Sequence, residues 1–152
     1  MKLTPETVNK EIAELFPGSE MPCVELGARH AVVCKPLVGT PLRPGGFVSG
    51  PMQFGTADAA FWYAIFGALD RIEPMALTSE LSIRFLRPAQ GELLWARAEL
   101  HSVGRRNVVG TIRLWIDDLE DRPVSVAQGT YVLPPPQSDS QQREAEIPGS
   151  AC

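Results

Sequence analysis

The sequence contains few of the residues that usually bind metals or build disulfide frameworks. Its 152 residues include three cysteines and two histidines. The cysteines are odd in number and are not spaced like metal ligands; they are Cys23, Cys34 and Cys152. We therefore expect reduced thiols, as in a cytoplasmic protein. No acidic or cysteine cluster accompanies His30 or His101, which we expect at the surface. The sequence therefore predicts neither a metal site nor a bound cofactor.

Net positive charge and long apolar runs are also lacking. Fourteen Lys and Arg residues stand against 18 Asp and Glu, a net charge of −4. This balance argues against nucleic-acid binding through bulk positive charge. The most apolar stretch, 51–69, is interrupted by Gln53, Thr56 and Asp58, and the N-terminus has no apolar core typical of a signal peptide. We therefore expect neither a nucleic acid nor a membrane as a partner.

The apolar pattern of the first half of the chain predicts two helices separated by extended structure. Thr4 is a capping residue, and the proline that follows suits a first helical turn. Residues 22–38 are expected to be extended, with a break near Gly27. Residues 51–69 are apolar on nearly all sides, which predicts a long buried helix.

After Pro74 the apolar period becomes two, which indicates β-strands. Four such segments follow, at 77–86, 93–102, 107–116 and 124–133. Short hairpins after a long helix favour an α+β fold, in which a curved antiparallel sheet of about five strands wraps the helix. The expected organisation is one domain over 1–133, whose first 19 residues are a helix and linker. A Pro-rich tail, 134–152, is expected to be disordered.

Three motifs, in this order and spacing, carry a resemblance to a known family. They are "SGPMQFGTAD" (49–58), "LTSELSIRFLRP" (77–88) and "VAQGTYVLP" (126–134). Together they resemble the hotdog-fold thioesterases of the phenylacetate-degradation type over roughly residues 20–133. Where the family usually has His-Gly-Gly, this chain has Ser49-Gly50-Pro51, similar to a variant branch. The resemblance implies the hotdog fold, an acyl-CoA substrate, and a dimer joined at the sheet edges or a dimer of such dimers.

The resemblance implies catalytic roles for Asp58, Gly50 and Thr78. Asp58 falls at the family's acid position, where it activates water or attacks the thioester directly. The Gly50 N–H, at a helix start, is the family's donor to the oxyanion. Pro51 has no N–H and cannot replace it. Thr78 stands where relatives carry a Ser or Thr near the attacking water. A purely structural role for Asp58, as an acid bonded to neighbouring backbone, is the alternative.

The spacing of Gly50 and Asp58 has a consequence that does not depend on the family. Eight residues span roughly 12 Å of helix at about 1.5 Å per residue. One carbonyl group cannot contact both groups in the same chain. If both act, they belong to different subunits, and a two-fold dimer with antiparallel helices would bring them together in two equivalent sites.

Further residues are candidates for contacting an acyl-CoA. Arg43, Arg105 and Arg106 suit its phosphates, since guanidinium forks match anions; solvated loop and turn charges are the alternative. Gln53 and Trp62 would line the pocket. The full set of candidates is Ser49, Pro51, Gln53, Arg43, Phe54, Trp62, Arg105 and Arg106. The aromatic content of the helix suits a medium-chain or aromatic acyl group.

Two rival functions remain. A hotdog hydratase would use a histidine with the acid, so the missing family histidine counts against it. A non-catalytic hotdog protein that senses or carries acyl-CoA is the stronger rival, because an altered motif is compatible with lost activity. Substitution of Asp58 separates a hydrolase from a binder.

Overall fold

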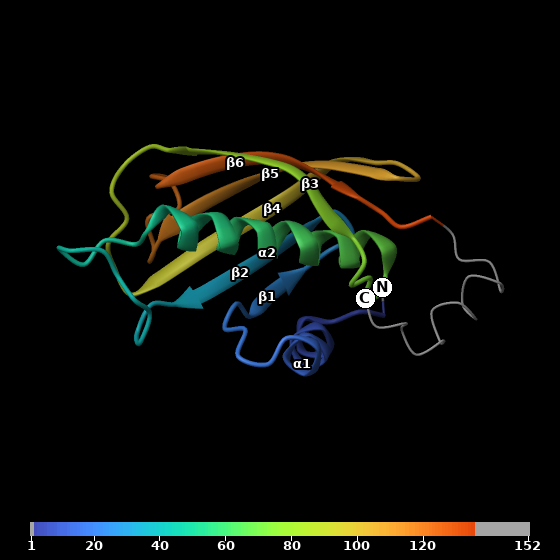
Figure 1. Ribbon diagram of the computed structural model, residues 1–152, viewed down its shortest axis with the longest axis horizontal. Helices are drawn as coiled ribbons and strands as arrows, with labels where there is room; N and C mark the ends of the chain where they lie inside the picture. Colours follow the sequence, from blue (N-terminus) through green and yellow to red (C-terminus); the bar gives the residue numbers. More distant parts are fainter. Residues whose placement is uncertain (1, 136–152) are drawn as a thin grey trace, which may run out of the picture.

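The long apolar segment forms a helix that lies across one face of a curved antiparallel sheet (Figure 1). The computed structural model describes residues 2–135; most of the predicted tail, 136–152, lies outside this range. The helices are α1 (Pro5–Leu15) and α2 (Gly50–Leu69). The strands are β1 (Cys23–Leu26), β2 (His30–Pro36), β3 (Leu77–Phe85), β4 (Leu93–Val103), β5 (Asn107–Ile116) and β6 (Ser125–Val132).

Within the described residues the sheet has six strands in the order β1-β2-β4-β5-β6-β3. The sequence predicted about five strands, since the segment 22–38 was expected to be a single extended segment with a break. It forms two strands, β1 and β2, which accounts for the sixth. Gly27 makes the turn between them, where its N–H donates to the His30 carbonyl at 2.9 Å. A Cβ on Gly67 of α2 would collide with the Gly27 carbonyl oxygen, so the helix packs on this turn only through glycine. The predicted α+β architecture is otherwise confirmed.

Both predicted helix starts are present. Thr4 caps α1 by accepting from the Thr7 N–H at 3.2 Å. Ser49 caps α2 by accepting from the Met52 N–H, also at 3.2 Å. Pro51 occupies the first turn of α2, where its missing N–H costs no helical hydrogen bond. No helix within residues 2–135 combines the length and apolarity needed to cross a membrane.

The prediction that α2 is buried on nearly all sides was only partly correct. Residues that face the sheet are fully enclosed, as Phe61 and Phe66 show. Residues spaced four apart on the other side, Phe54, Asp58 and Trp62, are partly exposed, with Phe54 at 38%. A single sheet covers only one side of a helix, and residues four apart share a face. The chain therefore leaves an uncovered stripe on α2, and Asp58 lies in it.

Strand β3 is the outermost strand on one side of the sheet and pairs only with β6. The sequence placed Leu77, Leu81, Ile83 and Phe85 on one apolar face. Leu81 and Ile83 do pack against the core, but Leu77 and Phe85 are more than half exposed. A register shift between Thr78 and Glu80 breaks the alternation near the start of the strand, and an edge strand has cover on fewer sides.

Candidate active site

Asp58 receives two hydroxyl hydrogen bonds on one carboxylate oxygen. The Thr78 Oγ1 donates to Asp58 Oδ1 at 2.8 Å, and the Tyr131 hydroxyl donates to the same oxygen at 2.6 Å. Thr78 on β3 and Tyr131 on β6 are direct partners across the strand pair. Within residues 2–135 no donor contacts the second oxygen, Oδ2. The carboxylate is thus held on one side and free on the other.

Tyr131 is fixed by its surroundings. Its ring is buried and stacks on Phe61, with centroids 4.8 Å apart and planes 13° apart. Burial, and next the neighbouring Asp58 carboxylate, raise the pKa of Tyr131 well above its usual range. The phenol therefore stays protonated and remains a hydrogen-bond donor to Asp58.

A cavity of about 370 Å³ opens beside Asp58. Its walls come from α1, α2 and the start of β3, and they are mainly apolar, with Ile12, Phe16, Trp62 and Leu77 among them. Asp58 is the one carboxylate in the lining. A carboxyl group at the wall of an apolar cavity suits a ligand whose polar reacting group is attached to an apolar chain or ring.

Trp62 is held in place within this cavity wall. Its indole Nε1 donates to the Ala76 carbonyl at 3.1 Å. The ring meets Phe16 of the α1–β1 connection edge to face, with centroids 5.7 Å apart and planes 79° apart. The N-terminal segment therefore contributes directly to the cavity at Asp58.

Gly50 lies in a different hollow, of about 640 Å³, at the other end of the uncovered helix stripe. Arg43 and Gln53 line the same hollow. No acceptor for the Gly50 N–H is present among residues 2–135. Gln53 is buried; its Nε2 donates to the Val48 carbonyl at 3.3 Å, while its Oε1 has no partner in the described part of the chain. This end of α2 thus offers a free donor and an unpaired acceptor.

The structure therefore separates the residues singled out from the sequence into two groups. Asp58, Thr78 and Trp62 surround one cavity, and Gly50, Gln53 and Arg43 surround the other. Helix α2 is continuous between Gly50 and Asp58. The roughly 12 Å between them in one chain is consequently a property of the folded molecule and not only of the sequence.

The remaining candidates lie away from both cavities or serve the backbone. Ser49 caps α2, and Pro51 and Phe54 are exposed on its first turns. Arg105 and Arg106, at the β4–β5 hairpin, line neither cavity, and the Arg106 Nε donates to the Leu133 carbonyl at 2.8 Å. Over residues 2–135, no three His, Cys, Asp or Glu side chains gather closely enough to hold a metal ion.

Tyr131 is the site residue that the sequence did not single out. Its signal was present: in β6 it lies on the same side as the small residues Ala127 and Gly129, so a large polar side chain points inward among small ones. A buried phenol needs a hydrogen-bond partner. Its partner, Asp58, is 73 residues away in the chain.

Comparisons with known proteins bear on the family and the fold of the chain. Residues 45–122, just over half of the chain, match the family model of the thioesterase superfamily. A proposed thioesterase from Silicibacter sp. TM1040 superposes with a TM-score of 0.80 at 29% identity, over 89% of this chain and 94% of that one. A comparison with curated proteins gives no match.

Two more distant structures share the fold. A thioesterase from Haemophilus influenzae aligns with a TM-score of 0.77 at 17% identity, over 91% of this chain and 96% of that one. A single-residue variant of the phenylacetic acid degradation protein PaaI from Thermus thermophilus aligns with a TM-score of 0.65 at 19% identity, over 82% and 99%. The chain belongs to the thioesterase superfamily, as a thioester hydrolase with the hotdog fold.

Proposed function

We propose that this protein hydrolyses acyl-CoA thioesters in reaction centres shared between two copies of the chain. Asp58 of one copy would activate the attacking water, or attack directly, while the Gly50 N–H of the partner subunit holds the carbonyl oxygen. The observation that carries the proposal is the state of Asp58: two hydroxyls fix one of its oxygens at the wall of an apolar cavity, and the other oxygen is free.

The need for two chains follows from the helix. Gly50 and Asp58 lie too far apart along α2 to contact one carbonyl group. Two α2 helices running antiparallel about a two-fold axis would place each N-terminus beside the other's Asp58. The uncovered stripe of Phe54, Asp58 and Trp62 supplies a surface for such a contact, since partly exposed aromatic residues gain from being covered.

The proposed chemistry uses the free oxygen of Asp58. Oδ2 takes a proton from water, and the water oxygen bonds to the thioester carbon. The Gly50 N–H, reinforced by the helix dipole, stabilises the oxyanion that forms. Collapse of this intermediate breaks the carbon–sulfur bond and releases the CoA thiolate, which recovers a proton. The products are a carboxylic acid and free CoA. In the direct-attack variant, Oδ2 itself bonds to the carbon, the carbon–sulfur bond breaks to release the CoA thiolate, which recovers a proton, and water then cleaves the mixed anhydride to the carboxylic acid and free Asp58.

Tyr131 acts in this scheme as a positioning residue, and Thr78 supports the same oxygen. Two donors on Oδ1 orient the carboxylate and leave Oδ2 directed to substrate. Because the pKa of Tyr131 is raised by burial and by Asp58, the phenol keeps its proton throughout the working pH range.

The cavity suggests how the substrate lies. Its apolar walls suit a medium-chain or aromatic acyl group, with CoA as part of the substrate and no further cofactor. Arg43 shares a hollow with Gly50, so it is the best placed of the candidate arginines to contact the anionic part of CoA. Arg105 and Arg106 remain candidates for contacting CoA, although they line neither cavity.

The proposal is tested by complementation between two inactive variants. Asp58→Asn removes the base, and Gly50→Pro removes the N–H while keeping a residue that the first helical turn accepts. A purified heterodimer of the two carries one intact site of two, so about half of the parental turnover should return. Gly50→Ala retains the N–H and serves as the matched control.

Failure of the heterodimer to recover activity, with both variants folded and associated, would contradict the shared site. Recovery cannot arise if both groups act within one chain, because every chain in the heterodimer carries one defect. Turnover is measured on acyl-CoA substrates of graded chain length and on aryl-CoA substrates, which also narrows the acyl group.

A further inference from the structure

A second cavity adjoins the one beside Asp58, and the proposed chemistry does not use it. It measures about 440 Å³ and lies between α1, the connection that follows α1 and the end of β2. Its walls are mainly apolar, with Ala13, Met21 and Val38 among them, and Glu20 is its one charged side chain among the described residues. We call it the α1 cavity, and the first one the Asp58 cavity. An apolar space of this size has room for part of an acyl chain.

Three residues line both cavities and form what we call the shared wall. They are Ile12, Ser19 and Tyr63. Ile12 and Tyr63 are buried, while Ser19 is exposed at the rim. The side chains of Ile12 and Tyr63 therefore decide whether the two cavities stay separate or join.

The shared wall lies on the side of α2 opposite to the residues that hold the acid. The hydroxyls on Asp58 come from β3 and β6, and β3 is the last strand at one edge of the sheet. Helix α1 lies beside β1, the strand at the other edge (Figure 1). An acyl group that has its carbonyl at Asp58 and fills the Asp58 cavity therefore ends against the shared wall.

Tyr63 is fixed in this wall at both ends of its side chain. Its hydroxyl donates to the Met21 carbonyl at 3.0 Å. Its ring packs beside Trp62 and Phe66, with centroids 6.3 and 6.2 Å away. Burial raises the pKa of Tyr63 to about 12, so the hydroxyl keeps its proton and remains a donor. The ring is therefore a firm boundary between the two cavities.

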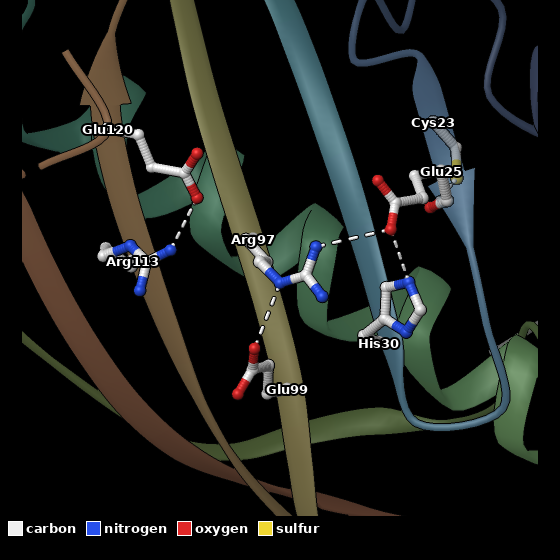
Figure 2. A network of polar contacts seen from close by, with 7 residues as sticks. All are labelled: Cys23, Glu25, His30, Arg97, Glu99, Arg113 and Glu120. Carbon is white, nitrogen blue, oxygen red and sulfur yellow. Dashed lines mark hydrogen bonds and ion pairs between the residues drawn. The ribbon is translucent and has the colours of Figure 1, made fainter.

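Ile12 is held by the way α1 docks on the sheet. Asn9, three residues earlier, donates its side-chain amide to the Cys23 carbonyl and accepts from the Cys23 N–H, both at 2.8 Å. Strand β1, which carries Cys23, is tied in turn to β2 and β4, because Glu25 contacts side chains of those strands at 2.7 and 3.4 Å (Figure 2). The helix that carries Ile12 thus has a fixed position relative to α2.

We propose that Ile12 and Tyr63 set an upper limit on the length of the acyl group, with the α1 cavity left outside the substrate site. This inference rests on the proposed function, since it takes an acyl thioester to bind with its carbonyl at Asp58. A chain longer than the Asp58 cavity must either displace the fixed wall or withdraw its carbonyl from Asp58. In both cases kcat/KM falls beyond one chain length.

The α1 cavity is poorly equipped to bind a ligand of its own. Asn9 and Glu20 are polar residues that line it and not the Asp58 cavity. The Asn9 amide is engaged by the backbone of Cys23, and Glu20 contacts Lys35 at 3.4 Å. A separate ligand needs convergent polar groups to fix its orientation, whereas the end of an apolar chain does not.

The test opens the shared wall by Ile12→Ala. On straight-chain acyl-CoA substrates of graded length, the chain length with the highest kcat/KM should increase. Each methylene that enters the α1 cavity should raise kcat/KM about fourfold, which follows from the free energy of burying a CH₂ group. Val8→Ala is the matched control, because Val8 is equally buried one turn earlier on the same face of α1 but lines neither cavity. It should leave the preferred length unchanged, and circular dichroism checks that both variants are folded.

A second substitution separates an opened wall from a general loosening of the protein. Ala13 is exposed on α1 and lines the α1 cavity alone. Ala13→Trp fills that cavity, so the double variant with Ile12→Ala should lose the added preference for long chains. In the otherwise parental chain Ala13→Trp should not shift the preferred length, because the acyl group stops before Ala13.

Binding distinguishes a failure of this inference from a failure of the proposed function. Non-hydrolysable thioether analogues of the same chain lengths, measured by calorimetry, should show the same shift in affinity even if the parental protein cleaves no thioester. An equal preferred length in the parental protein and Ile12→Ala, or an equal shift in Val8→Ala, overturns the length limit. So does a shorter preferred length in Ala13→Trp alone, since the acyl group would then already pass the wall. A protein that neither cleaves nor binds any chain length refutes both proposals.

Discussion

Thr78 and Tyr131 are direct partners across the β3–β6 pair, and their hydroxyls converge on the same oxygen of Asp58, at 2.8 and 2.6 Å. The edge strand β3 and its neighbour β6 therefore both donate hydrogen bonds to the same side of the Asp58 carboxyl group. This relationship fixes the orientation of the Asp58 carboxyl group, because both hydroxyls donate to Oδ1. Oδ2 is left without a donor and is the oxygen available to act as a base or nucleophile. Several expected outcomes depend on it.

Replacing Tyr131 with Phe should lower kcat about 10–100-fold and leave KM nearly unchanged. A hydrogen bond to a charged group contributes about 1.5–3 kcal/mol, and its loss affects the reacting carboxylate rather than substrate binding. Steady-state kinetics on a CoA thioester measure the split. Thr78→Val should act in the same direction, and Thr78→Ser, which keeps the hydroxyl, should restore most of the rate. Equal loss in Thr78→Ser and Thr78→Val would show that the hydroxyl is not the active feature.

Replacing Asp58 with Asn should lower kcat by about 10²–10⁴-fold, the usual contribution of a general base. The amide is nearly isosteric, so affinity for a non-hydrolysable thioether analogue of the substrate should persist. Calorimetry measures that affinity and a thiol-release assay measures turnover. A parental protein that binds the analogue without turning over any thioester would instead identify an acyl-CoA binder.

Neither tyrosine should ionise near pH 10 while the protein is folded. The chain has two, Tyr63 and Tyr131; burial raises the pKa of Tyr63 from 10.0 to about 12, and burial and Asp58 raise that of Tyr131 further. In the unfolded chain both phenols ionise near pH 10. The contribution of the two tyrosines to stability should therefore be constant below about pH 10 and fall above it, by up to about 1.4 kcal/mol per pH unit for each tyrosine.

Spectrophotometric titration of tyrosinate, with urea unfolding at each pH, measures both effects. Tyr63→Phe should reduce the slope of the alkaline loss. Ionisation of a phenol near pH 10 in fully folded protein would contradict the burial that the structure gives these residues.

Two glycines in α2 should respond oppositely to alanine. Gly67→Ala should destabilise the fold by about 1–3 kcal/mol, because its Cβ would press into the Gly27 carbonyl and force the helix off the β1–β2 turn. Gly55→Ala meets only Met21 Cε at 3.6 Å, an ordinary contact, so the helix propensity of alanine should add up to about 1 kcal/mol. Chemical unfolding compares the two, and equal effects would refute the packing argument.

The fold was largely predictable because its signals are local. Capping residues at Thr4 and Ser49 mark the helix starts, and the change of apolar period after Pro74 marks the strands. The extra strand was missed because one glycine, Gly27, turns a single extended segment into a hairpin, and turn geometry depends on the contact with α2. The exposed ends of β3 depend likewise on strand order, which local pattern does not encode.

Part of the candidate site was predictable, since Asp58 on α2 and Thr78 at the start of β3 were both singled out from the sequence. Asp58 stands out in the sequence as a lone acid in an apolar segment. Tyr131 does not, because its role arises from a strand register that pairs it with Thr78 and from a helix packed beside both. The uncovered stripe on α2 was missed for a related reason. The sequence shows that the helix is apolar on nearly all sides, but it does not show whether the face with Phe54 and Trp62 is covered by the chain's own sheet or by another surface.

Helix α1 lies outside the segment matched by the family model, which begins at residue 45, yet Ile12 and the nearby Phe16 form part of the cavity wall beside Asp58. The residues around the acid therefore come both from inside the matched segment, in α2 and β3, and from outside it, in the N-terminal segment and β6. Substitutions among the first 20 residues can therefore alter one wall of the cavity without changing the β3–β6 pair that holds the Asp58 carboxyl group.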